Sequence, residues 1–207
     1  MNVHQIIGLT AAVICSTAAL PYFISIIKRE TVLNRASWFV WLAVGGVTFS
    51  SYLVSGARAT IFLPALYLVT NAIFFIMSLK YGEGGLSKFD LSCVAIAMFA
   101  LLVWWITRRS DYANYVSLMA EFIGFLPTYK KIWQRPETES YLAWGIATFA
   151  QFLNLFAIEQ RRAVIIVDPV SIFLDYFIVM LLLSRKYTLS GKKRRTTIAK
   201  KPLDSLS

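Results

Sequence analysis

Seven long apolar runs constrain this sequence more than any other feature. They are expected near 4–27, 37–56, 60–80, 90–107, 113–133, 141–158 and 163–184. A helix needs about 20 residues to cross the hydrocarbon core of a bilayer, and each run approaches that length. The pattern therefore predicts an all-α, polytopic membrane protein with seven transmembrane helices, whose first partner is the lipid bilayer.

The composition supports a membrane protein and argues against a nucleic-acid partner. Of the 207 residues, 57% are hydrophobic and 15% are charged, whereas a soluble domain carries about 25% charged residues. The net charge is +10, but eight of the 21 lysines and arginines lie in the last 23 residues. The others fall in the gaps between apolar runs, where basic residues set membrane topology. We therefore expect no nucleic acid to bind.

A second feature is an internal repeat at an offset of 106 residues. Residues 20–38 and 126–144 share five identities, namely an opening Leu-Pro pair, an isoleucine, an arginine and a closing tryptophan. The Lys-Tyr dipeptide at 80–81 recurs at 186–187, again 106 residues later. Recurrence of one offset over 60 residues indicates a duplication, and such repeats define the architecture of a chain.

The duplication predicts the domain organisation. Residues 1–81 form a first three-helix repeat, 82–112 a connector that contains helix 4, and 113–187 a second three-helix repeat. Residues 188–207 form a basic cytoplasmic tail. A single connector helix makes the two repeats parallel, related by an axis along the membrane normal.

Basic residues predict the orientation of the chain. Sixteen lysines and arginines fall on the side that holds the C-terminal tail, and five fall on the other side. Positive residues stay cytoplasmic, so the N-terminus is expected outside and the C-terminus inside, in a plasma or inner membrane rather than an organelle. The GKKRR run at 191–195 would attract anionic lipid, or serve only as a topological anchor.

The second copy of the repeat carries a family resemblance. Pro127, the RPETES run at 135–140 and Trp144 resemble the proline, basic loop and polar turn of the PQ-loop and SWEET-like superfamily. The resemblance extends to about residue 187 and implies a 3+1+3 helix fold that transports small solutes. The sequence departs from the family because Tyr22 and Thr128, not glutamine, follow the two prolines.

Two carboxylates are expected near the middle of the membrane, Glu121 in the fifth run and Asp175 in the seventh. A charged side chain at that depth costs about 2.5–3.5 kcal/mol, so it faces the bundle interior or takes up a proton. Both are candidates for proton coupling or for counter-ions of a cationic substrate. Asp168 and Ser171 share a helix face with Asp175. The alternative is a protonated carboxyl group that bonds to a neighbouring helix.

Candidate substrate-binding residues come from the resemblance and from helix faces. SWEET-like proteins place an asparagine pair on helices 3 and 7, which implies Asn71 and, as a charged replacement, Asp175. Gln151 and Asn154 share one face of the sixth run, and Thr48 is the repeat equivalent of Asn154. We predict that these residues form the pocket walls. For Asn71, an interhelical hydrogen bond is the alternative.

Two tryptophans and two prolines complete the candidates. Trp38 and Trp144 fit interfacial belt residues better than pocket walls, because they stand close to the cytoplasmic loops. Pro21 and Pro127 each interrupt a helical hydrogen bond and bend the helix. Their symmetric placement predicts paired hinges of an inner gate, with static kinks as the alternative.

These features predict a small-solute transporter, a uniporter or proton-coupled, that works by alternating access. Its partners would be a small polar solute, cationic or neutral, or protons. The alternative is a non-transporting seven-helix receptor or assembly protein with a protonation-switched site. His4 and the distant Cys15 and Cys93 form no catalytic or metal-binding spacing, so we expect no enzyme activity, no metal and no cofactor. A homo-oligomer is left open.

Overall fold

The computed structural model describes residues 3–54, 62–107, 110–158 and 170–185. Across these ranges the chain is all-helical, with one isolated β-bridge and no strand, as the sequence predicts. A further helix occupies 170–185. The other elements are α1 (Val3–Ile27), α2 (Arg35–Val54), α3 (Phe62–Tyr81), α4 (Lys88–Thr107), α5 (Ser110–Gln134), η1 (Pro136–Thr138), α6 (Tyr141–Asn154) and η2 (Leu155–Ala157).

The helices follow the seven predicted apolar runs, with one difference. The sixth run ends its α-helix at Asn154 and continues as the 3₁₀ turn η2. The predicted start of the seventh run, near residue 163, lies outside the described residues. By length and hydropathy one described helix, α1, could cross a membrane by itself, while Ala65–Tyr81 and Tyr141–Ala157 are shorter apolar helices.

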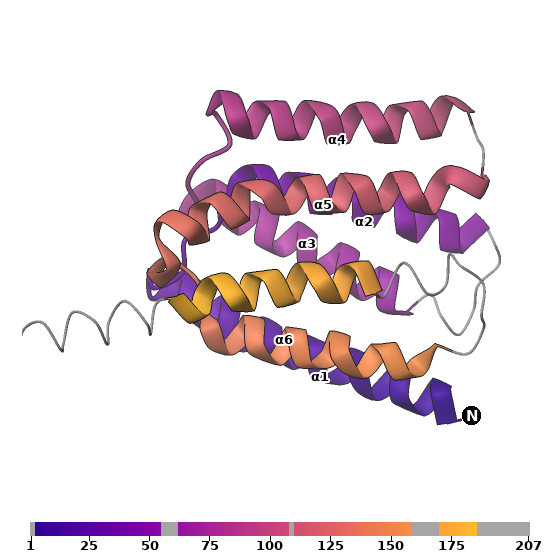
Figure 1. Ribbon diagram of the computed structural model, residues 1–207, viewed down its shortest axis with the longest axis horizontal. Helices are drawn as coiled ribbons and strands as arrows, with labels where there is room; N and C mark the ends of the chain where they lie inside the picture. The colour runs from indigo at the N-terminus through magenta and orange to yellow at the C-terminus, as the bar shows by residue number, and fades with distance from the viewer. Residues whose placement is uncertain (1–2, 55–61, 108–109, 159–169, 186–207) are drawn as a thin grey trace, which may run out of the picture.

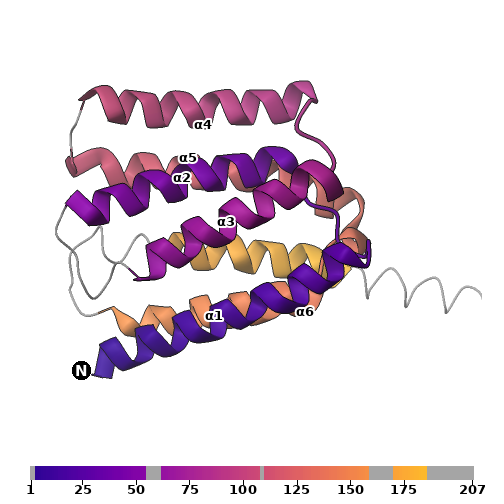
Figure 2. The same ribbon diagram turned by 180° about the vertical axis from the view of Figure 1, so that it is seen from behind.

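The helices lie side by side in a bundle whose two edges differ (Figure 1). α4 forms one edge and packs on α5 and α2, whereas α1 and α6 pair at the opposite edge. α3 and the 170–185 helix lie between these edges (Figure 2). The offset of 106 residues relates α1 to α5 and α2 to α6, so the α1–α6 and α5–α2 pairs are equivalent contacts.

The two copies of the repeated stretch have the same local structure. Each copy forms the end of one helix, a turn and the start of the next helix. Asn34 caps α2, because its side-chain oxygen accepts from the Ser37 amide at 3.1 Å. Ser140 caps α6, accepting from the Ala143 amide at 3.3 Å. Asn34 and Ser140 stand 106 residues apart, so the two caps are equivalent and each satisfies an otherwise free helix amide.

The α2–α5 contact is unusually close because of Gly124. A Cβ atom at that position would lie 2.9 Å from Cγ1 of Val40 and 3.1 Å from Nε1 of Trp41. Small residues allow helix backbones to approach in this way. The core beside this contact is aromatic, with Trp41 and Phe125 ring centroids 4.7 Å apart. A second apolar cluster, which includes buried Ala97 and Leu101, joins α4 to α2 and α5.

Candidate functional site

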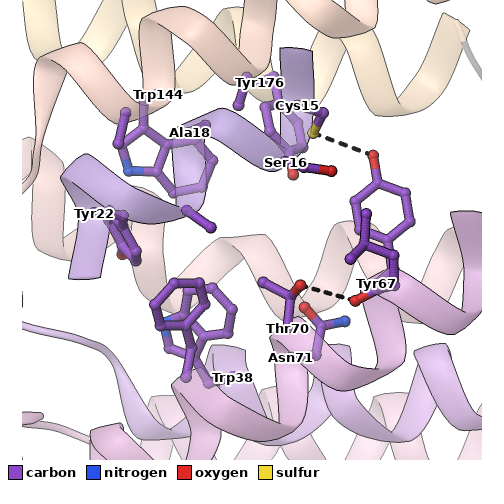
Figure 3. A pocket seen from close by; sticks show the side chains of 15 residues that line it. Cys15, Ser16, Ala18, Tyr22, Trp38, Tyr67, Thr70, Asn71, Trp144 and Tyr176 are labelled. Carbon is purple, nitrogen blue, oxygen red and sulfur yellow. Dashed lines mark hydrogen bonds between the residues drawn. The ribbon is translucent and has the colours of Figure 1, made fainter. Parts of the chain in front are cut away.

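A cavity of about 150 Å³ lies between the first three helices, α1–α3, and two later helices, α6 and the 170–185 helix. Its walls come from α1, α2, α3, α6 and the 170–185 helix (Figure 3). Six of the lining side chains are aromatic: Tyr22, Trp38, Tyr67, Phe74, Trp144 and Tyr176. Among the lining residues none is a lysine, arginine, aspartate or glutamate. Two of the lining residues, Ser16 on α1 and Leu66 on α3, are exposed at the surface.

The cavity exists on the α1 side of the bundle because α1 has small side chains there. Ala18 and Ala19 line it, and their repeat equivalents on α5 are Gly124 and Phe125. The Phe125 side chain is 2% exposed, and its ring centroid lies 5.8 Å from that of Tyr176. Phe125 therefore occupies space on the α5 side that Ala19 leaves open on the α1 side.

Several polar groups of the wall already have partners. Tyr67 accepts a hydrogen bond from Nε2 of Gln151 at 2.8 Å, and its hydroxyl lies 3.5 Å from Sγ of Cys15. Nδ2 of Asn71 donates to the Trp41 carbonyl oxygen at 2.9 Å. The Thr70 hydroxyl donates to the carbonyl oxygen of its own helix one turn earlier. These contacts leave few free donors to meet a ligand.

A buried carboxylate, Glu139, lies at one end of the cavity, behind two of its lining side chains. It was not among the residues predicted from the sequence. Oε2 of Glu139 accepts from the Tyr22 hydroxyl at 3.1 Å and from Nε1 of Trp144 at 2.9 Å. Lys131 forms an ion pair with Oε1 and also donates to the Val32 carbonyl oxygen. A buried ion pair is tolerated where further hydrogen bonds satisfy both partners, and this pair meets that condition.

One signal in the sequence points to this pair. Lys131 shares a helical face with Gly124 and Thr128, at spacings of seven and three residues. A lysine on the same face as a close-packing glycine needs a buried acidic partner. The Thr/Glu/Ser-rich turn supplies one eight residues later, in Glu139.

Asp175 and Asn71 do not share the cavity wall. Asn71 is a lining residue, whereas the lining residue next to Asp175 is Tyr176. Asp175 is buried, and its Oδ1 accepts from the Tyr129 hydroxyl at 2.7 Å. This contact joins α5 to the 170–185 helix. Glu121 is half-buried on α5, eight residues before Tyr129.

Of the other predicted site residues, none whose side chain the structure describes is among those that line the cavity. Gln151 is buried behind Tyr67, and Asn154 is half-buried at the end of α6. Thr48 belongs to α2, but its side chain and all of Asp168 lie outside the described residues. Ser171 is half-buried near the start of the last helix.

Trp38 and Trp144 are pocket residues and not lipid-facing belt residues. Their side chains are 8% and 6% exposed, and both line the cavity. Figure 3 shows both beside Tyr22, on the side of the cavity away from Tyr67. The expected belt position is therefore wrong, because the turns that precede these tryptophans fold inward over the bundle.

Each of the two prolines directly precedes a residue whose side chain donates a hydrogen bond to the other three-helix repeat. Pro21 is followed by Tyr22, which donates to Glu139 beyond α5. Pro127 is followed by Thr128, whose hydroxyl donates to Oγ of Ser37 on α2 at 2.8 Å. Movement at either proline would therefore act on a contact between the repeats.

Comparison with protein-family models, with curated protein sequences and with solved structures gives no match for this chain.

Proposed function

We propose that this chain is a polytopic membrane protein that transports a small solute by alternating access, with the aromatic cavity as its substrate site. The observation that carries the proposal is the position of the cavity between α1–α3 and the later helices. In a transporter built from repeats, a substrate site at the repeat interface is exposed to each side in turn as the repeats rock.

The outer surface supports a lipid environment. α4 stands at the edge of the bundle and exposes a continuous set of large apolar side chains: Leu91, Ile96, Phe99, Leu102, Val103, Trp105 and Ile106. Soluble proteins rarely expose apolar patches larger than a few hundred Å². In a membrane these side chains would contact acyl chains, and the positive residues would orient the chain with its N-terminus outside.

Alternating access also requires that one end of the cavity is closed by contacts that can break. The network around Glu139 closes the end of the cavity that the basic residues assign to the cytoplasm, and it joins Tyr22 of α1 to Lys131 of α5. Inward opening would separate these contacts. Asp175 and Tyr129 would serve as the proton-linked element, because Tyr176 connects Asp175 directly to the cavity wall.

The test is uptake into proteoliposomes from a panel of labelled small solutes, with and without a pH gradient. Ala19→Phe gives α1 the phenylalanine that α5 has at the equivalent position, Phe125. The larger side chain should fill the cavity and abolish uptake. Ala95→Phe is the matched control, because Ala95 is exposed on α4. Normal uptake by Ala19→Phe would refute the cavity as the route. Saturable binding without uptake would instead favour the receptor function.

Membrane topology is tested by labelling single cysteines. A cysteine at position 135, in the turn between α5 and η1, should react with an impermeant reagent only after permeabilisation. A cysteine at 58 or 161 should react from outside. Outside labelling at 135 would invert the proposed orientation and remove the inner-gate assignment.

A further inference from the structure

We infer that the cavity selects a compact organic monocation of the methylated-ammonium type, a substrate class that rests on the proposed function. The inference starts from size. A cavity of about 150 Å³ accommodates a ligand as small as benzene, which excludes disaccharides and peptides. It leaves room for a cation with a handful of heavy atoms.

The aromatic rings around the cavity are inclined steeply to one another. The Tyr22 ring is inclined by 89° to Phe74 and by 82° to Trp144, and Trp144 is inclined by 62° to Tyr176. These rings pack against one another with centroids 5.1, 6.3 and 5.2 Å apart, so the wall that they share presents ring planes in several orientations. A quaternary ammonium group is attracted to aromatic faces within about 6 Å, and aromatic cages recognise it in this way.

The polar groups of the cavity wall already form hydrogen bonds within the protein, and this disfavours a sugar as the ligand. The hydroxyl groups of Ser16 and Thr70 donate to their own helices, and the Asn71 amide donates to α2. Two other polar atoms of the wall, the Tyr22 hydroxyl and the Trp144 indole nitrogen, donate away to Glu139. A sugar would leave many of its own hydroxyl groups unpaired here, at a cost for each.

The charges nearest the wall favour a cation. Glu139 touches two lining side chains and Asp175 is covalently next to a third, Tyr176. The lysine of this region, Lys131, is already paired with Glu139. Because Lys131 balances the charge of Glu139, Asp175 is the carboxylate that favours a cation, and an anionic ligand would meet no cationic lining side chain.

The experiment compares choline chloride with 3,3-dimethylbutan-1-ol, its neutral carbon isostere, by calorimetric titration of the full-length protein. Choline should bind at least about tenfold more tightly, because only the charged ligand gains from the ring faces. Glucose should show no binding. Equal affinity for the two isosteres, or no binding of choline, would overturn the inference.

A variant separates the ring face from the shape of the pocket. Phe74→Leu keeps an apolar side chain of similar size and breaks no hydrogen bond, and Phe74 is buried in the wall. It should weaken choline binding several-fold and leave the neutral isostere unchanged. Phe99→Leu, on the exposed face of α4, should change neither. Equal weakening of both ligands by Phe74→Leu would show a packing effect and refute the cation-binding role.

The two proposals fail in different ways. Choline that binds but is never taken up would refute transport and leave the ligand class standing. Uptake of another solute that Ala19→Phe abolishes, and that choline does not inhibit, would refute the ligand class and leave transport standing.

Discussion

The amide nitrogen of Val32 donates to the carbonyl oxygen of Thr138 at 2.9 Å. These residues stand 106 residues apart, the offset that relates the two copies of the repeated stretch. A residue that bonds to its own repeat equivalent lies close to the axis relating the copies. The two turns therefore meet on that axis, directly beside the Lys131–Glu139 pair, and in the proposed alternating-access cycle these turns would separate on inward opening.

The first prediction concerns the buried ion pair. Glu139→Ala should lower the free energy of unfolding by about 3–5 kcal/mol, because it leaves Lys131 buried without its partner. The repeat equivalents of Lys131 and Glu139 are Ser25 and Leu33. Introducing both, as Lys131→Ser with Glu139→Leu, should restore part of the loss, because it removes the unpaired lysine although Tyr22 and Trp144 still lose their acceptor. Thermal unfolding of the purified protein measures each effect.

A matched control for this pair is available at the surface. Arg135 and Glu83 form an ion pair whose side chains are 49% and 32% exposed. Arg135→Gln should cost at most about 1 kcal/mol, because solvent screens exposed pairs. A double variant at 131 and 139 that is less stable than Glu139→Ala would contradict the argument.

The second prediction concerns the α2–α5 contact. Gly124→Ala should destabilise the protein by about 1–3 kcal/mol, because the new methyl group would overlap Val40. Gly46→Ala is the control, since a Cβ atom there meets nothing within 4 Å. It should be neutral or stabilising by up to about 1 kcal/mol through helix propensity. Equal melting temperatures for the two variants would show that α2 and α5 are not in close contact.

The third prediction concerns the prolines. Pro21→Ala and Pro127→Ala should each lower the rate of uptake more than they lower the amount of protein in the membrane, and together they should nearly abolish uptake. The reason is that each proline precedes a side chain that bonds across the repeats. Initial uptake rates normalised to protein amount measure this effect. Unchanged rates in both variants would identify the prolines as static kinks.

The fourth prediction concerns Asp175. Asp175→Asn should preserve folding, because the amide oxygen can still accept from Tyr129 and an uncharged side chain costs less to bury. It should abolish uptake driven by a pH gradient and retain part of the exchange of bound substrate, which needs no net release of protons. Glu121→Gln should have a smaller effect. An unchanged pH profile of uptake in Asp175→Asn would remove this residue from proton coupling.

The helices and the equivalence of their ends could be predicted from the amino-acid sequence. The length and apolar character of a run are local properties, so the seven runs matched the described helices to within a few residues at most ends. The structure adds two equivalent caps, in which Asn34 and Ser140 each accept from an amide three residues later. Asn71 could be proposed as a wall residue because the resemblance to SWEET-like proteins implies an asparagine on helix 3.

Which of the equivalent residues face the cavity depends on how the helices pack against one another. Trp38 and Trp144 lie close to loops in sequence, yet the packing of the turns buries both. The face that Lys131 shares with Gly124 and Thr128 indicates a buried lysine, but only the packing of α1 and α6 brings Tyr22 and Trp144 onto the Glu139 carboxylate. The cavity itself depends on a difference of volume between Ala19 and Phe125. That difference has no local signature, because the space beside a side chain is set by the helices that pack around it.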